Sequence, residues 1–267
     1  MRSFAYLQPT SVPEAVALLG STMESRPIAG GMTLLPTIKQ RLAAPDALID
    51  LSHIPGLAGI AEEGATLTIG AMTRHAQVAK SPLVRARLPA LAGLAAGIGD
   101  PAVRNRGTIG GSIANNDPAA DYPAAVLGLD ATIVTSEREL AADAFFIGLF
   151  ETALRPDEIV TALCFPVPLA AGYAKFKAPA SRYALVGVFV ARTAEGVRVA
   201  VTGAGPGVFR VPAMEEALGA RFDPDAIAAI RIDADGLNSD MHAEASYRAH
   251  LVTVMAKRAV LAALERA

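Results

Sequence analysis

The sequence predicts a protein of the α+β class with a domain boundary near residue 170. Hydrophobic residues make up 52% of the 267 residues and charged residues 19%, which is typical of a globular chain with a substantial core. Signals for helices and strands are mixed up to Pro166 and Pro168, where the character of the chain changes. After these prolines come three strand-like segments, and two helical segments close the chain.

The elements can be assigned in order from capping signals and apolar patterns. A first helix is expected from Ser11 to Gly20, because Ser11 and Glu14 have the spacing of a capping box and glycine is a common stop. Thr33 is expected to cap a second helix over 34–42. The remaining expected strands are 47–51, 66–69, 132–134, 158–165, 173–177, 183–192 and 197–202, and the remaining expected helices are 83–97, 117–128, 224–230 and 241–266.

Two glycine-rich loops stand out from this background. Residues 107–120 read Gly-Thr-Ile-Gly-Gly-Ser-Ile-Ala-Asn-Asn-Asp-Pro-Ala-Ala, with Asp121 directly after, and residues 28–33 read Ile-Ala-Gly-Gly-Met-Thr. Glycine lets a ligand approach the backbone closely, and the helix start after the first loop offers N–H groups to an anion. We interpret the two loops as binding one dinucleotide through its pyrophosphate. The alternative is that both glycine pairs are ordinary turns.

Other site patterns are missing from the sequence. There is no Gly-x-Gly-x-x-Gly in a βαβ unit, no P-loop and no Gly-x-Ser-x-Gly elbow. A third glycine cluster, 203–207, is interpreted as a structural loop. The four histidines lack metal-ligand spacing, and His75 is expected to be structural at a helix start. We therefore expect no catalytic residue and no metal site, which suits a cofactor with its own chemistry, such as a flavin.

Composition limits the partners and the location. The net charge is −2 and no basic stripe stands out, so no nucleic-acid partner is expected. No apolar run approaches the roughly 20 residues of a membrane span, so no transmembrane segment is expected. The N-terminus lacks an apolar signal core, which favours a cytoplasmic location. The single cysteine, Cys164, cannot form an internal disulfide or ligate an iron–sulfur cluster alone, and we expect it to be buried in a strand.

At this point the residues resemble a known family over nearly the whole chain. The chain is similar to the FAD-binding medium subunits of the molybdenum hydroxylases, the group that includes carbon monoxide dehydrogenase and xanthine dehydrogenase. The residues that carry the resemblance are Phe4-x-Tyr6-x-x-Pro9, Glu14-Ala15, Ala29-Gly30-Gly31, Leu34-Leu35, Thr108 to Ser112, Asp117 to Asp121, Lys175-Phe176-Lys177, Ser181-Arg182, Asp240 to His242, Tyr247-Arg248, Leu251 and Lys257 to Ala259.

The resemblance implies a fold. Residues 1–170 would form a two-lobed FAD-binding domain of the vanillyl-alcohol-oxidase (PCMH) type, with lobes of about 1–55 and 56–170. Residues 171–267 would form a small α+β domain with a three-stranded antiparallel sheet.

The resemblance also implies partners. This chain would bind FAD, and molybdopterin and [2Fe–2S] clusters would lie on a large and a small partner subunit, in a dimer of heterotrimers. Electrons would run from the clusters through FAD to an external acceptor. NAD, a quinone, oxygen and a carrier protein are all compatible with the sequence, as are many organic substrates.

Site residues carry over from the family one by one. Asp121 would accept a ribose or ribityl hydroxyl, and Lys177 would stabilise negative charge on the reduced flavin. Met32 departs from the family, whose members usually have a small or polar residue there. The expected FAD-binding residues are Arg26, Ala29, Gly30, Gly31, Met32, Thr33, Leu34, Ile98, Gly99, Thr108, Gly110, Gly111, Ser112, Ala114, Asp121, Val160 and Lys177.

Two other functions are weighed against this one. A free-standing FAD oxidoreductase with its own substrate is disfavoured by the scarcity of acid–base residues near the loops. A non-catalytic assembly subunit that has lost FAD is disfavoured by the intact glycine loops. Substrate turnover by the isolated chain would favour the first, and failure to take up FAD the second.

Overall fold

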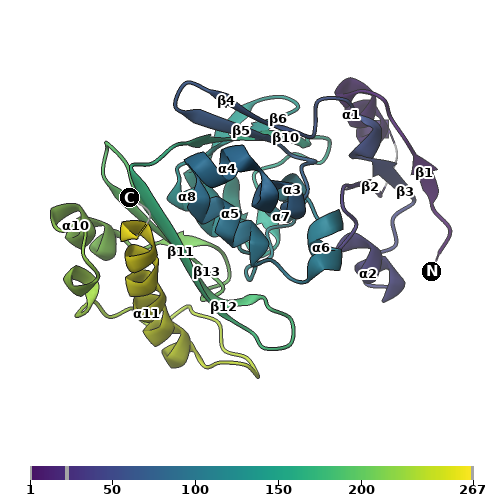
Figure 1. The fold of residues 1–267 in the computed structure, drawn as a ribbon. Coiled ribbons are helices and arrows are strands. Elements are labelled where there is room, and N and C mark those ends of the chain that lie inside the picture. Colours follow the sequence, from purple (N-terminus) through teal and green to yellow (C-terminus); the bar gives the residue numbers. More distant parts are fainter. Residues whose placement is uncertain (1, 22–23, 266–267) are drawn as a thin grey trace.

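The N-terminal part of the chain forms a small parallel sheet. We analysed a computed structural model, which describes residues 2–21 and 24–265. Strand β3 (Ala47–Asp50) lies between β1 (Ala5–Leu7) and β2 (Ser25–Ile28), and both neighbours run parallel to it. The helical elements of this part are α1 (Val12–Ser21), α2 (Leu34–Lys39) and η1 (Leu51–His53), and they lie at one end of the molecule (Figure 1).

The middle of the chain forms a five-stranded antiparallel sheet covered by short helices. The strands lie in the order β4 (Ile60–Glu63), β5 (Thr66–Gly70), β10 (Val160–Pro166), β6 (Thr132–Thr135) and β7 (Glu139–Ala141). The helices are α3 (His75–Lys80), α4 (Pro82–Arg87), α5 (Pro89–Ala96), α6 (Pro101–Arg106), α7 (Ile109–Asn115), α8 (Tyr122–Gly128) and α9 (Ala142–Phe145). A hairpin of β8 (Phe146–Gly148) and β9 (Glu151–Thr152) follows α9.

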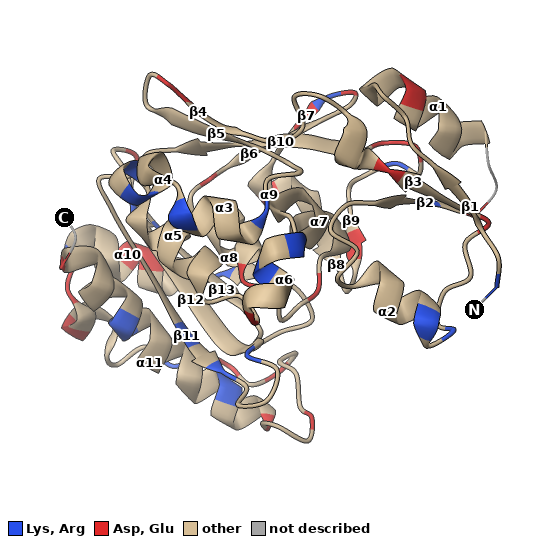
Figure 2. Ribbon diagram, turned by 45° about the vertical axis from the view of Figure 1, so that its right-hand side comes forward, with Lys and Arg blue, Asp and Glu red and all other residues tan. Residues whose placement is uncertain are grey.

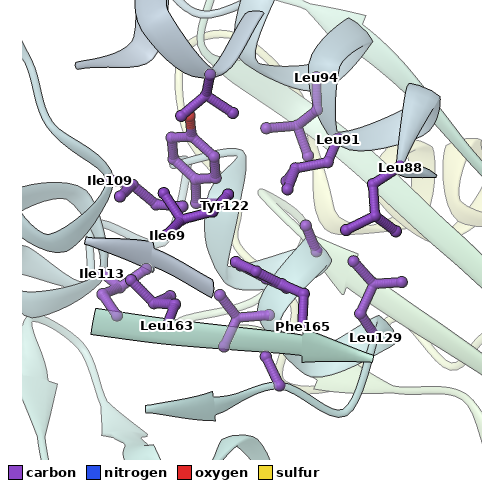
Figure 3. Close-up of a cluster of buried hydrophobic side chains, with 14 of the residues drawn as sticks. Ile69, Leu88, Leu91, Leu94, Ile109, Ile113, Tyr122, Leu129, Leu163 and Phe165 are labelled. Carbon is purple, nitrogen blue, oxygen red and sulfur yellow. The ribbon is translucent and has the colours of Figure 1, made fainter. Parts of the chain in front are cut away.

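The largest core fills the space between this sheet and its helices. Ile69, Leu163 and Phe165 point from β5 and β10 toward Leu91 of α5 and Tyr122 of α8 (Figure 3), and all five side chains are fully buried. Small alanines occupy many of the other positions, which lets the helices pack close to the sheet.

The last part is a second antiparallel sheet. It consists of β11 (Ala170–Lys177), β12 (Ala184–Arg192), β13 (Val197–Thr202) and the two-residue strand β14 (Phe209–Arg210). Helix α11 (Ala245–Leu264) lies on β11 so closely that a Cβ on Gly172 would be 2.0 Å from the carbonyl oxygen of Ala259. Because α8 packs against β12 and β13, the sheet joins the rest of the fold (Figure 1). The remaining elements are α10 (Pro212–Ala220) and η2 (Pro224–Ile227).

Several expected elements differ in the structure. The helix expected over 83–97 is broken into α4 and α5, because Pro89 cannot donate a backbone hydrogen bond and starts the second helix. Asp117-Pro118 forms a turn in which Asp117 Oδ1 accepts the N–H of Ala119, so the helix begins only at Tyr122. Residues 224–230 contain only the 3-10 turn η2, and the long closing helix starts at Ala245 rather than at 241. The end expected at Arg266 lies outside the described residues.

Smaller corrections concern a cap and a side chain. Ser11 Oγ accepts the N–H of Glu14, but the carboxylate of Glu14 accepts from Thr10 instead of Ser11, so the capping box is only half formed. Cys164 is half-buried, not buried, with its sulfur 3.6 Å from the hydroxyl oxygen of Thr68. None of the described helices has the length and apolar character needed to cross a membrane.

Candidate functional site

A cavity of about 500 Å³ lies where the parallel sheet, the helices of the middle part and the β11–β12 hairpin meet. Most of its walls come from the stretches 26–43, 98–121, 154–160 and 181–183, and Leu51, Ala71, Met72 and His75 complete the lining. Both glycine-rich stretches line it, so the structure brings together two loops that are almost 80 residues apart. Of the predicted site residues, all except Lys177 line the cavity: Arg26, Ala29, Gly30, Gly31, Met32, Thr33, Leu34, Ile98, Gly99, Thr108, Gly110, Gly111, Ser112, Ala114, Asp121 and Val160.

The residues of the first glycine loop line the cavity, and their backbone N–H groups have no hydrogen-bond acceptor among the described residues. The N–H groups concerned are those of 29–34, which join β2 directly to α2. Gly31 adopts the left-handed conformation with φ of +70°. A left-handed residue among successive N–H groups forms a concave, anion-binding nest. The expected side-chain cap from Thr33 is not made, so its hydroxyl is not used to close the helix.

The second glycine stretch is a helix, not a loop. Thr108 caps α7 by accepting the N–H of Gly111 at 3.1 Å, and the N–H of Gly110 donates to the carbonyl of Ala71 at 2.9 Å. The carbonyl of Thr73 accepts the N–H of Ile109. These donors are therefore not available to a ligand, which corrects the expectation that both loops offer N–H groups.

Packing explains the glycines of this helix. A Cβ on Gly110 would lie 2.4 Å from the Cβ of Ala71, far inside any real contact. A Cβ on Gly111 would lie 2.9 Å from Thr108 Oγ1 and 3.5 Å from the Cβ of Ala29. Gly111 therefore sits where α7 approaches the first glycine loop.

A histidine supports the wall behind α7. The N–H of His75 donates to the carbonyl of Gly107, and its ring lies 5.3 Å from the ring of Tyr122. Nδ1 of His75 is buried without a hydrogen-bond partner among the described residues. Burial, together with the nearby guanidinium of Arg104, lowers the pKa of His75 to about 4, so its ring is neutral at physiological pH. The sequence-based expectation of a structural histidine at a helix start agrees with this position.

A buried ion pair ties three parts of the wall together. The carboxylate of Asp121 accepts from Tyr173 Oη at 2.5 Å and lies 2.9 Å from the ammonium of Lys175. The same ammonium donates to the carbonyls of Gly97 and Arg182, each at 3.0 Å. Burial raises the pKa of Asp121, and the charge of Lys175 and the hydrogen bonds oppose that shift.

The lysine that pairs with Asp121 is Lys175, whereas the resemblance placed Lys177 beside the flavin. Lys177 is exposed and does not line the cavity. Residues 175 and 177 would share a face in a regular strand, but the register of β11 against β12 shifts between Phe176 and Lys177. Because of this bulge, Lys175 contacts Asp121 whereas Lys177 is exposed.

A second buried carboxylate also serves the structure. Glu158 accepts two hydrogen bonds from Arg138 at 3.0 Å each and one from Thr135 at 2.6 Å. Although burial alone would raise the pKa of Glu158, these hydrogen bonds lower it to about 2. Because the carboxylate is permanently charged and fully bonded, it holds the segment 154–160 against the middle sheet.

Some wall residues were missed by the sequence analysis. Ser181, Arg182 and Tyr183 reach the cavity from the tip of the β11–β12 hairpin, and Leu154 and Ile159 from the segment before β10. The hairpin tip has no glycine signature; Ser181-Arg182 carried part of the family resemblance but was not assigned to the site, and Tyr183 stood only at the start of an expected strand. Tyr183 is 46% exposed, which leaves its ring at the edge of the cavity.

Two family models and several known proteins match nearly the whole chain. The family model described as the FAD binding domain in molybdopterin dehydrogenase matches residues 2–168, and the CO dehydrogenase flavoprotein C-terminal domain matches 171–263. The nicotine 6-hydroxylase medium subunit of Paenarthrobacter nicotinovorans is 38% identical over 97% of this chain and 96% of its own. The carbon monoxide dehydrogenase medium chain of Hydrogenophaga pseudoflava is 39% identical over 98% of each chain.

Solved structures agree with these matches. A chain of reconstituted CO dehydrogenase from Oligotropha carboxidovorans superposes with a TM-score of 0.90 at 33% identity, covering 100% of this chain and 99% of the other. A chain of quinoline 2-oxidoreductase from Pseudomonas putida 86 also gives 0.90, at 28% identity, covering 99% and 98%. The α+β class and the C-terminal antiparallel sheet are thereby confirmed, but this sheet has four strands rather than the expected three, because the short strand β14 pairs with β13.

Replacing Lys175 should destabilise the protein strongly. The variant Lys175→Met leaves the Asp121 carboxylate buried without its cation, and we expect a loss of roughly 3–5 kcal/mol in the free energy of unfolding. The matched control Lys177→Met removes an exposed lysine two residues away and should change stability by less than about 0.5 kcal/mol. Urea unfolding of both variants measures the difference, and equal losses would contradict the assigned role of Lys175.

The neutral His75 predicts a pH dependence of stability. Its pKa falls from 6.5 in the unfolded chain to about 4 in the folded one, so between these values only the unfolded chain is protonated. The contribution of the neutral His75 to stability is complete above pH 6.5 and is lost as the pH falls toward about 4. In His75→Gln, the slope of unfolding free energy against pH in this window should fall by up to roughly 1.4 kcal/mol per pH unit. Identical slopes for both proteins would refute this assignment.

Proposed function

Because the chain belongs to the family of FAD-binding medium subunits of molybdenum hydroxylases, we propose that it passes electrons from [2Fe–2S] clusters of a partner subunit through FAD to an external acceptor. The observation that carries the proposal is the convergence of both glycine-rich stretches on one cavity, with no acceptor among the described residues for the six N–H groups of 29–34. A glycine turn with a left-handed residue and a row of N–H groups without a protein acceptor is suited to an anionic ligand.

The donors of the first loop fit the pyrophosphate of FAD. Hydrogen bonds to charged groups contribute roughly 1.5–3 kcal/mol each, so several N–H groups from 29–34 bind an anion tightly without a lysine in the loop. Met32 can take part through its backbone alone, because its side chain is 37% exposed. Methionine at this position, which departs from the family, therefore does not weaken FAD binding.

The other walls fit the rest of the cofactor. Ile98, Gly99 and Val160 offer an apolar surface for the flavin ring, and α7 closes the cavity beside the first loop. Asp121 uses its oxygens for Tyr173 and Lys175 but keeps a lone-pair position for one hydroxyl of the cofactor. The proposed FAD-binding residues are therefore all the predicted ones, of which only Lys177 lies outside the cavity lining.

The chain's own part in electron transfer is to bind, orient and shield. FAD, when bound, supplies the redox chemistry. Asp121 and Glu158 are each fixed by a cation and by hydrogen bonds, so the walls do not need to rearrange when charge on the ring changes. The ammonium of Lys175 also locks the carbonyls of Gly97 and Arg182 on two sides of the cavity.

The proposal extends to assembly and location. It includes a large molybdopterin subunit and a small [2Fe–2S] subunit, a dimer of heterotrimers, and a cytoplasmic location. Relatives named as medium chains or medium subunits support a multi-subunit complex. The division into domains of 1–170, with lobes of about 1–55 and 56–170, and of 171–267 also stays a prediction, supported by the separate sheets before and after residue 170.

One pair of variants tests the FAD site. In Gly111→Val the branched side chain enters the gap between α7 and Ala29, so the two loops must separate and FAD should be lost. We expect the circular dichroism spectrum of the fold to be kept. The matched variant Met32→Ala, on the other side of the gap, should retain FAD, as measured by flavin absorbance after gel filtration. Full FAD occupancy in Gly111→Val would refute the proposed geometry.

A second experiment tests the direction of electron flow. The FAD-loaded chain is mixed anaerobically with the pre-reduced iron–sulfur subunit of its complex, and both absorption signals are followed in a stopped-flow instrument. We expect the flavin band to bleach while the cluster band returns to its oxidised form. Reduction of the flavin by a small organic donor without that subunit would instead favour a free-standing oxidoreductase.

A further inference from the structure

Basic residues are concentrated in one stretch of an otherwise acidic chain. Six of the 24 lysines and arginines lie between residues 74 and 106, together with one of the 26 acidic residues. This stretch therefore has a formal charge of +5, and the other residues, with 18 basic and 25 acidic side chains, have −7. The sequence analysis found no basic stripe because the six residues are spread over 33 positions.

The fold gathers these residues on three neighbouring helices. Helix α3 packs against both α4 and α6, and Figure 2 shows the basic segments of all three helices on one side of the molecule. We name this surface the basic face. It consists of Arg74, Lys80, Arg85, Arg87, Arg104 and Arg106, of which all but the half-buried Arg104 are exposed.

The charges of the basic face are largely uncompensated. Only Arg87 forms an ion pair with another described residue, at 2.5 Å from Glu62. Asp100, the single acidic residue of the stretch, is occupied as the cap of α6, where it accepts the N–H of Val103. The face therefore attracts anions over the distance of a Debye length, about 10 Å at 0.1 M salt.

The basic face borders the FAD cavity. Nη1 of Arg104 donates to the carbonyls of Ile98 and Gly99 at 2.9 and 3.0 Å, and both residues line the cavity. Val103, on the same helix, lines it as well. A molecule that docks on α6 is therefore separated from the cavity by one short helix.

We propose that the basic face is the docking surface for an acidic electron-carrier protein that serves as the external acceptor. The proposal rests on the proposed function and selects one acceptor class from those that the sequence leaves open. Two oxidised carriers would each take one electron from the reduced flavin, and two protons would be released to solvent.

The character of the face favours a transient protein partner. None of the exposed large hydrophobic side chains lies between residues 74 and 106, whereas permanent subunit interfaces are more apolar than transient redox contacts. Five of the six basic residues are exposed and none of the six lines the cavity, so they suit a broad acidic protein surface better than a small dinucleotide. Opposite charges on two such surfaces raise the association rate, and salt weakens the attraction between the surfaces.

The test uses the intact complex and a defined probe. The triple variant Arg74→Glu, Lys80→Glu and Arg106→Glu reverses three exposed charges that do not line the cavity. A control variant, Arg221→Glu, Arg231→Glu and Arg258→Glu, makes the same change in net charge on exposed residues of the C-terminal part. The affinity of each complex for an acidic plant-type [2Fe–2S] ferredoxin is measured at about 10 and 150 mM salt.

We expect the wild-type complex to bind the ferredoxin about tenfold more tightly at the lower salt concentration. The triple variant should lose about tenfold or more in affinity at low salt, and the control variant less than about twofold. Flavin absorbance reports FAD content separately, so loss of docking with full FAD is distinguished from failure of the proposed function.

Four results would overturn the proposal. Equal losses in both triple variants would mean that only net charge matters. Release of the iron–sulfur subunit by the triple variant would make the face a permanent subunit interface. A DNA duplex that competes equally with the ferredoxin would make the face a general anion-binding surface. Loss of NADH binding with unchanged ferredoxin binding would assign the face to a dinucleotide.

Discussion

The approach of Gly30 to the chain at Arg106 and Gly107 is the contact on which the site depends. A Cβ on Gly30 would lie 2.2 Å from the carbonyl oxygen of Arg106 and 2.7 Å from the Cα of Gly107, so only glycine permits this approach. The contact joins the parallel sheet to the helices of the middle part. It places the N–H groups of 29–34 beside α7, and without it the two glycine-rich stretches would not share a cavity.

The C-terminal sheet fixes the remaining wall, so the cavity is a product of the whole fold. Thr202 Oγ1 donates to the carbonyls of Pro118 and Ala120, and the N–H of Gly203 also donates to Pro118. The N–H of Ala184 donates to the carbonyl of Ala119. These bonds hold the turn before Asp121 from outside, while Lys175 holds Asp121 itself. A turn without secondary structure of its own thereby becomes a rigid part of the site.

Sequence reasoning succeeded where local chemistry decides the structure. The first glycine loop, the long strands β12 and β13 and the first helix follow from patterns that act within a few residues. It failed where distant contacts decide. Gly110 and Gly111 read as a loop because glycine disfavours helices, but the packing of Gly110 on Ala71 makes glycine the only residue that this helix can carry there. The strands β1 and β2 are three and four residues long and form only by pairing with β3.

Lys175 and Lys177 show the same limit of local sequence reasoning, because only one of them reaches Asp121. Alternation along a strand assigns both lysines to one side, and nothing in the local sequence marks the bulge between Phe176 and Lys177. The pairing of β11 with β12 decides which ammonium reaches Asp121. Local sequence therefore could not show that Lys175, and not Lys177, forms the ion pair with Asp121.

The molecule uses different electrostatics for its cofactor and for the surface beside it. In the proposed site, the anion meets backbone N–H dipoles of the turn at Gly31, where Gly30 and Gly31 are half-buried, and salt screens partly buried interactions less than exposed ones. On α3, α4 and α6, exposed side-chain charges act at longer range and are screened strongly. A flavin that must stay bound through many cycles needs the first arrangement, and a carrier that must arrive and leave in each cycle needs the second. The net charge of −2 conceals this division, because the basic face and the acidic remainder of the chain nearly cancel.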